Sequence, residues 1–502
     1  MVGIGLTAAA TTTQREIFPF YSWFLFATVP NGKTTYQVVL HRVNGQEIDP
    51  ALPLNQASAL VGGNARSIVL YRVVQRYGQA LRNGDAAGAA RERGYLEAKL
   101  PAATRYEVVR ERGDAIERWH HHGTPIVESL GFFDSVATTA IETAPASESW
   151  VTWLLLPLVV AGLAFLAFSR RRWERLLRPL RHFFSGNPGP GRPGSFRHSF
   201  PFRRQTAAWR QATLLTRVYY VTLAYLAVEL IPQWTARMAV VPVHPLWPIG
   251  WLAYLPPHGT ILGILSFYLA GAMMAAIFPE YRAARIAAFL GVLFFVAYDN
   301  SFGKIGHSMH GWVLTSAVLV FLPPHGSHES SRRATRQGYL QIFWTAAVIL
   351  SLVYTLAGLG KVGGFFYQLV SGEMTVLHPK ALAEQVAERL SQTDSESVVG
   401  SWIIDHYWAG WPLYLGMIYI QFFSLWAVFR PVLLRPWAVA LLLFHVGSYF
   451  VFTILFLPNV LLVGFLFLAS PWARPLNLGP AMWRELPLIG IAVRRFQARM
   501  AR

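Results

Sequence analysis

The stretch AAFLGVLFFVAYDNSFGKIGHSMHGWVLTSAVLVFL, residues 287–322, places a polar segment between two apolar runs. The polar segment, Tyr298 to His310, holds an Asp, an Asn, a Lys and two His. An unpaired polar group in a bilayer core is costly, because no water is present to solvate it. Such a segment is therefore either a turn that meets water or the lining of a bundle interior, where ionisable groups mark function. Both interpretations stay open from this stretch alone.

The composition is that of a protein that crosses a membrane several times. Of the 502 residues, 53% are hydrophobic and 14% are charged. The net charge of +18 comes almost entirely from Arg, which clusters in the connections between apolar runs. This pattern is typical of positive-inside topology, and no nucleic-acid partner is expected. The absence of Cys excludes disulfides, thiolate metal sites and Cys nucleophiles.

Residues 1–149 predict a small α+β domain outside the membrane. A strand over Thr35 to Val43 is followed by Asn44-Gly45, a strong hairpin signal. The other expected elements are helices at Ser67 to Arg82 and Ala86 to Leu100, and a second hairpin that pairs Arg105 to Arg112 with Ala115 to His121.

Three consecutive histidines, His120 to His122, follow in the same domain. Neighbouring positions on a strand point to opposite faces, so the three imidazoles do not converge easily on one ion. No metal site is predicted.

Nine membrane spans are predicted. They are Trp150 to Phe168, Leu214 to Ile231, Thr260 to Phe278, Ala287 to Ser301, His310 to Leu322, Leu340 to Leu356, Trp411 to Val428, Ala438 to Leu455 and Val460 to Leu468. Alternating these spans places every Arg-rich connection on one side, which we expect to be cytoplasmic. The expected domains are an extracytoplasmic (periplasmic) domain at 1–149, the first span with a basic linker at 150–210, a transmembrane domain at 211–471 and a basic cytoplasmic tail at 472–502.

This topology places Lys361 at the same membrane face as the polar segment, which allows Lys361 to approach His307. A Lys at an apolar boundary has its charged form disfavoured, and a neutral amine is then available as a base. Alternatively its side chain extends toward the lipid headgroups, as is common for Lys near helix ends.

His445 lies inside the predicted span Ala438 to Leu455, about 12 Å along a helix from Trp437. Ser448 and Tyr449 share its helix face. An imidazole at that depth needs a partner, so His445 is expected to face the bundle interior, in a structural or a catalytic role.

The order of these residues resembles the vitamin K-dependent γ-glutamyl carboxylase and its bacterial relatives, which are grouped as the HTTM membrane domain. The matching segments are Asp299-Asn300-Ser301, His307-Ser308, Ala357-Gly358-Leu359-Gly360-Lys361 and Phe444-His445. The resemblance covers roughly Arg217 to Pro471, and it is carried by order and spacing, since no single motif is specific. Lys361 matches the second Lys of a pair in the family, and Gly360 stands in place of the first.

In that family the Lys is assigned as the base that deprotonates a hydroquinone. The reaction of the hydroquinone with oxygen yields a stronger base, which removes a glutamate γ-proton before carbon dioxide adds. The resemblance implies that Lys361 is the catalytic base, that His307 orients it or stabilises charge, and that the cofactor is a vitamin K-type hydroquinone, with no metal. The implied substrate or quinone pocket includes Asn300, Ser308, His310 and His445. The implied location is a bacterial inner membrane.

Two functions of different classes follow. The first is a quinone-linked enzyme, either a carboxylase-like lyase or ligase or an oxidoreductase, that modifies a peptide or protein at the outer face. The second is a non-catalytic membrane anchor or subunit, whose outer domain and the connection Lys361 to Tyr407 dock a partner. Gly360 in place of the first Lys favours the second function, whereas Lys361, His307 and Asn300 favour the first. Membrane lipid is an expected partner in both.

Overall fold

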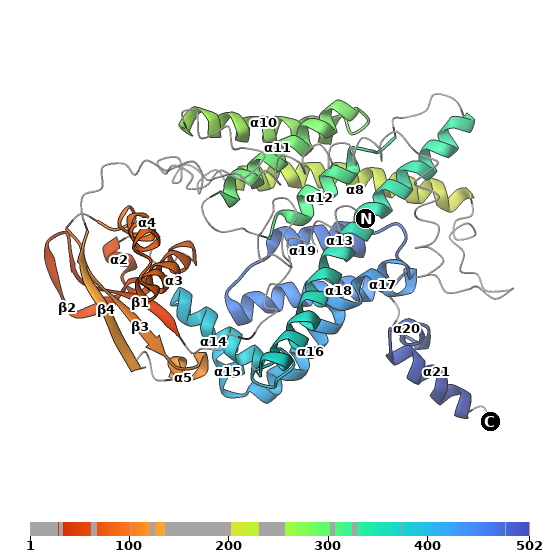
Figure 1. The fold of residues 1–502 in the computed structure, drawn as a ribbon. Helices are drawn as coiled ribbons and strands as arrows, with labels where there is room; N and C mark the ends of the chain where they lie inside the picture. Colours follow the sequence, from red (N-terminus) through yellow and green to blue (C-terminus); the bar gives the residue numbers. More distant parts are fainter. Residues whose placement is uncertain are drawn as a thin grey trace.

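A computed structural model describes residues 29, 34–61, 68–101, 103–120, 126–135, 202–229, 257–301, 307–323, 329–372, 374–476 and 478–500. Over these residues the chain is mostly helical and contains one small antiparallel sheet. The sheet and its helices lie at one end of a helical bundle (Figure 1). This arrangement agrees with the predicted helical bundle and its small N-terminal α+β domain. The predicted span Trp150 to Phe168 lies outside the described residues.

The sheet has the strand order β2-β1-β3-β4, and all neighbouring strands are antiparallel. Its strands are β1 (Thr35–Val43), β2 (Gln46–Pro53), β3 (Arg105–Arg112) and β4 (Ile126–Asp134). Asn44 and Gly45 connect β1 to β2 with φ angles of 50° and 79°, which matches the two positive values of a type I′ turn. The predicted first hairpin is therefore confirmed.

Helices cover one face of this sheet. They are α3 (Ile68–Asn83) and α4 (Ala86–Glu97), and a 3-10 turn η1 (Leu54–Gln56) and a short helix α2 (Ser58–Val61) precede them. Tyr36, Val38 and Leu40 of β1 pack with Tyr77 of α3 and Tyr106 of β3 in one buried cluster. The two predicted helices are confirmed.

The predicted second hairpin is wrong, because Ala115–His120 form a helix, α5, and β3 pairs with β4 instead. Asp114 and Glu117 start this helix. The Glu117 N–H donates to Asp114 Oδ1 (2.6 Å) and the Asp114 N–H donates to Glu117 Oε2 (3.3 Å), which is a capping box. His120 ends α5, and His121 and His122 lie outside the described residues. No cluster of three metal-binding side chains occurs among the residues that the structure describes.

The helices of the bundle follow. They are α8 (Phe202–Glu229), α10 (Pro257–Ile277), α11 (Arg282–Asn300), α12 (His310–Leu319), α13 (Glu329–Ser371), α14 (Ala381–Thr393), α15 (Val398–Asp405), α16 (Tyr407–Phe422), α17 (Ser424–Val428), α18 (Pro431–Phe452), α19 (Leu457–Val463), the π-helical turn η4 (Gly464–Leu468), α20 (Pro480–Glu485) and α21 (Ile489–Met500).

Each predicted span that falls on described residues coincides with a helix, but several ends differ. The predicted end at Leu356 is wrong, because α13 continues to Ser371 and so carries Lys361 inside a helix. The predicted span Trp411 to Val428 is interrupted at Phe423, between α16 and α17. Within the described ranges three helices are long and apolar enough to cross a membrane, namely Arg282–Asn300, Thr335–Ser371 and Pro431–Phe452.

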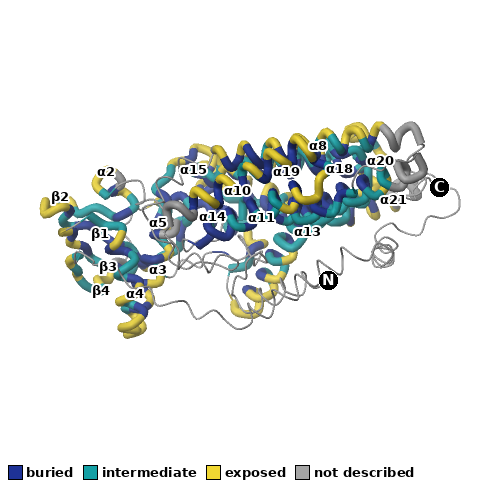
Figure 2. Tube along the Cα trace, turned by 90° about the horizontal axis from the view of Figure 1, so that it is seen from above, coloured by how far each residue is buried: buried dark blue, intermediate teal, exposed yellow. Residues whose placement is uncertain are grey.

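Outward faces of the helices carry large apolar side chains. On α8 these follow helical spacing, and Figure 2 shows exposed residues along the outer edge of this helix. The exposed apolar residues of α8 are Leu214, Val218, Val221, Tyr225 and Val228. Contiguous apolar surface is unfavourable in water but not in lipid. The bundle is therefore compatible with a membrane protein.

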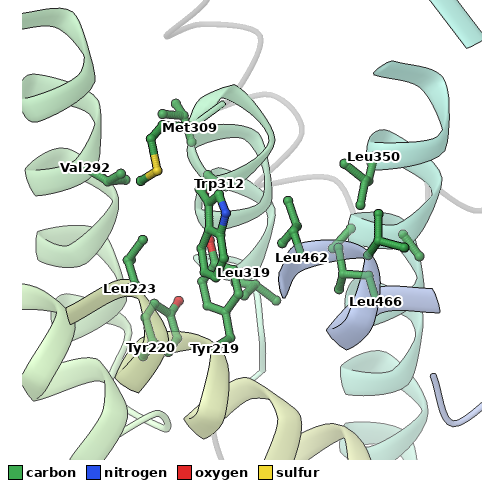
Figure 3. Close-up of a cluster of buried hydrophobic side chains, with 14 of the residues drawn as sticks. Tyr219, Tyr220, Leu223, Val292, Met309, Trp312, Leu319, Leu350, Leu462 and Leu466 are labelled. Atoms are coloured by element: carbon green, nitrogen blue, oxygen red, sulfur yellow. The ribbon is translucent and has the colours of Figure 1, made fainter. Parts of the chain in front are cut away.

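The buried apolar residues of the bundle form two clusters. The larger, which we call the bundle cluster, surrounds Trp312 of α12 (Figure 3). Tyr219 of α8 stacks on Trp312 at a ring distance of 4.8 Å, and the Trp312 indole N–H donates to the Pro458 carbonyl (2.9 Å). The smaller, which we call the junction cluster, joins α14, α15, α16 and the end of α18 to Ala115 of α5. The junction cluster thereby fixes the sheet domain to the bundle.

Candidate functional site

One face of α13 carries polar residues into the bundle. Ser351, Tyr354, Lys361 and Gln368 recur at spacings of three and seven residues and are all buried. Lys361 is only 2% exposed, so its side chain does not extend to lipid headgroups as a surface Lys does. The alternative in which Lys361 sits at a helix end is excluded by this position within α13.

His445 of α18 faces the same interior, as predicted, and its partner is Tyr354. The Tyr354 hydroxyl lies 2.6 Å from His445 Nε2, and the imidazole is 3% exposed. The rings of Phe444 and Phe456 lie 4.8 Å and 5.6 Å from the imidazole. Tyr354 was not predicted from the sequence. The available signal was its position seven residues before Lys361, on the same helix face.

Lys361 and His445 lie where the two apolar clusters meet. Along α13 the bundle cluster ends at Tyr354 and the junction cluster begins at Phe365, with Lys361 between them. Along α18, His445 and Ser448 likewise separate the members of one cluster from those of the other. We call Tyr354, Lys361, His445 and Ser448 the polar layer. By helical rise it is about 10 Å thick from Tyr354 to Lys361.

The polar segment between α11 and α12 is partly buried as well. Asn300 ends α11 at 3% exposure, and His310 begins α12 at 2% exposure. The His310 N–H donates to the carbonyl of His307 (3.3 Å), and His307 and Ser308 are half-buried. Of the two interpretations of this segment, an interior position is supported for Asn300 and His310. Residues 302–306 lie outside the described part of the chain.

The packing of α12 against α13 sets the height of this segment relative to Lys361. A side chain added at Gly311 would meet the side chains of Leu350 and Leu462, and one added at Gly338 would meet Pro323. Helices α12 and α13 are thus antiparallel, and the start of α12 lies near Leu350. Lys361 is eleven residues farther along α13, or about 16 Å by helical rise. The pairing of Lys361 with His307 stays a prediction.

A second polar site, not predicted from the sequence, joins the sheet domain to α14. The buried Arg118 forms an ion pair with the half-buried Glu388, and the Tyr71 hydroxyl donates to Glu388 Oε1 (3.0 Å). Glu384 Oε2 accepts from the Ala115 N–H at 3.1 Å. A cavity of about 60 Å³ is lined by Tyr71, Arg118 and Glu388. The available signal was Glu384 and Glu388, one helical turn apart in a predicted outer connection.

Burial raises the pKa of Glu384 to about 7, and the nearby Asp114 carboxylate adds to this shift. Burial likewise raises the pKa of Glu111, which lines the cavity. The Glu111 carboxylate accepts from Gln37 Nε2 at 3.0 Å. Two carboxyl groups at or beside the contact between the sheet domain and α14 are therefore disfavoured as anions.

The polar layer has one feature that fits an oxygen-bearing ligand such as a quinol. His445 Nδ1 is buried and has no hydrogen-bond partner among the described residues. A buried imidazole nitrogen without a partner is costly, and a hydroxyl or carbonyl oxygen of a ligand would satisfy it. The aromatic rings of Phe444 and Phe456 beside it suit a planar ring.

We compared the chain with protein-family models, with curated proteins and with solved structures, and none of them matches it. Any chemistry assigned to the polar layer is therefore inferred from its own residues.

Proposed function

We propose that this chain is a multi-pass protein of a bacterial inner membrane, with nine transmembrane helices and an outer sheet domain, whose polar layer binds a hydroquinone. The observation that carries this proposal is the burial of Lys361 on the same face of α13 as the Tyr354–His445 hydrogen bond. Ionisable groups inside an apolar bundle are costly and are kept where they act on a substrate.

The residues of the polar layer divide the chemistry between them. When bound, a hydroquinone supplies two weakly acidic hydroxyl groups and a pair of electrons. Lys361 is the candidate proton acceptor at Nζ, because its side chain is buried between the two apolar clusters, on the same helix face as Tyr354. His445 holds a hydroquinone oxygen at Nδ1, and Tyr354 fixes the orientation of the imidazole through Nε2.

The substrate that is modified is, on this proposal, a peptide or protein at the outer face. The sheet domain and α14 lie together at that end of the bundle, which is the arrangement that a protein substrate would meet. The resemblance to carboxylases supports glutamate as the modified side chain.

The experiment compares Lys361→Met with Lys380→Met in full-length protein reconstituted with a reduced vitamin K-type quinone. Both variants lose one side-chain amino group, but Lys380 is half-buried at the start of α14 and lies outside the polar layer. We expect Lys361→Met to lose quinol-dependent oxygen uptake, and the incorporation of labelled bicarbonate into peptide glutamate, by at least a hundredfold. Lys380→Met should keep both activities. Equal activity of the wild type and Lys361→Met would refute the assignment of the base.

A non-catalytic anchor is the second candidate, and the docking of the sheet domain favours it. An ion pair and several hydrogen bonds hold this domain to α14, while Phe132 on strand β4 is 54% exposed and available to a partner. If neither the wild type nor Lys361→Met binds the quinol, the anchor is the better description.

A further inference from the structure

The C-terminal helix α21 has most of its large apolar residues on one side of the helix. By helical spacing one side of α21 carries Ile489, Val493, Phe496 and Met500, at intervals of four, three and four residues. Ile489 is 41% exposed and Val493 is half-buried. The opposite side carries small or polar residues except for Ile491. The helix is therefore amphipathic, with an apolar stripe.

Short contacts place the start of α21 at the end of the bundle. Arg430 pairs with Glu485 of α20 (2.9 Å), and the Trp426 indole N–H donates to the Glu485 carbonyl (3.0 Å). The Tyr419 hydroxyl donates to the Pro487 carbonyl (2.7 Å). These partners lie at the end of α16, in α17 and just before α18, which is the end of the bundle away from the sheet domain (Figure 1). Indole and phenol groups at this level are typical of a membrane interface.

The direction of α21 also differs from that of the bundle. In Figure 1 it runs across the direction of the long helix α13 and away from the other helices. Gly490 permits the close turn between α20 and α21, because a side chain there would collide with the Arg484 carbonyl. This direction is compatible with a helix that lies along a membrane surface.

The charges of α21 indicate which kind of membrane surface it would bind. It carries Arg494, Arg495 and Arg499, and residues 486–502 contain no Asp or Glu. The nearest acidic residue, Glu485, is paired with Arg430. We propose that α21 is a membrane-surface helix that places its apolar stripe at the acyl boundary and binds the headgroups of anionic phospholipids through its arginines.

The absence of Cys from the chain allows a direct test with single labels. Val493→Cys lies on the apolar stripe, and Ala498→Cys is the matched control on the opposite side. Each full-length variant is spin-labelled in nanodiscs of phosphatidylcholine alone or mixed with phosphatidylglycerol. With the anionic lipid, we expect the label at 493 to be relaxed by oxygen and shielded from a water-soluble nickel complex. The label at 498 should show the reverse.

A variant in which the three arginines of α21 are changed to Gln is the second part of the test. Each basic residue near an anionic surface strengthens binding about fivefold, so three changes to Gln in α21 should weaken it about a hundredfold. The lipid exposure of the label at 493 should then be lost, as it should in phosphatidylcholine alone. Shielding of the label at 493 from both reagents would mean that protein covers the stripe, and equal lipid exposure in both bilayers would mean that anionic headgroups have no part. Either result would overturn the proposal.

Discussion

Changing Glu384 to Gln should remove most of the pH dependence with which the sheet domain docks on α14. Glu384 is 2% exposed, lies beside Asp114 and accepts from the Ala115 N–H. Its pKa rises from an ordinary 4.5 to about 7 in the docked state. The docked state therefore binds the proton more tightly. Docking is strongest below the ordinary pKa of a glutamate and weakens as the pH rises toward 7.

The size of this pH dependence follows from the shift in the pKa of Glu384. Each pKa unit corresponds to about 1.4 kcal/mol, so the free energy of docking should weaken by about 2 kcal/mol between pH 5 and pH 7.5. Glu111, whose pKa is also raised, adds a dependence of the same sign that remains in Glu384→Gln. His120 Nε2 also lies 3.6 Å from Asp405 Oδ1 across this contact.

The assay is a distance measurement between two spin labels in full-length protein. Ala87→Cys on α4 and Val398→Cys on α15 are both exposed and lie on opposite sides of the interface. The wild-type background should shift from one short distance at pH 5 toward a broad distribution at pH 7.5, whereas Glu384→Gln should keep the short distance. Glu396→Gln, an exposed carboxyl group nearby, is the control and should behave as the wild type. A broad distribution in Glu384→Gln at pH 7.5, equal to that of the wild type, would refute the reasoning.

Three further changes test the packing of the bundle and the interface. Tyr354→Phe leaves the buried Nε2 of His445 without its partner and should cost about 1 to 3 kcal/mol in the free energy of unfolding, measured with denaturant in detergent. Gly358→Leu should cost about 1 to 3 kcal/mol in the same assay, because a side chain there would collide with the backbone of α16, and a cost as small as that of an exposed site would contradict this contact. Arg118→Ala should cost about 2 kcal/mol of docking, since it strands the Glu388 carboxylate, and the additional change Glu388→Ala should recover part of that loss in the spin-label assay.

Local patterns in the sequence were sufficient for most helices and for the first hairpin. Asn44-Gly45 predicts its turn because both residues tolerate positive φ, and apolar runs predict helices because a bilayer requires satisfied backbone groups. The interior position of His445 followed from the cost of an imidazole at that depth. The second hairpin failed because the capping box of Asp114 and Glu117 starts a helix in the segment that was predicted as its second strand.

The sequence by itself determined most of the apolar helical segments, and that Lys361 and His445 are costly to bury. Only the tertiary structure decided that Tyr354 is the partner of His445, that Glu384 receives the start of α5, and that α13 runs past Lys361 as one helix. The physical reason is that periodicity and propensity report on neighbours within a turn or two. The partner of a buried polar group comes from another helix, at a distance along the chain that no local pattern encodes.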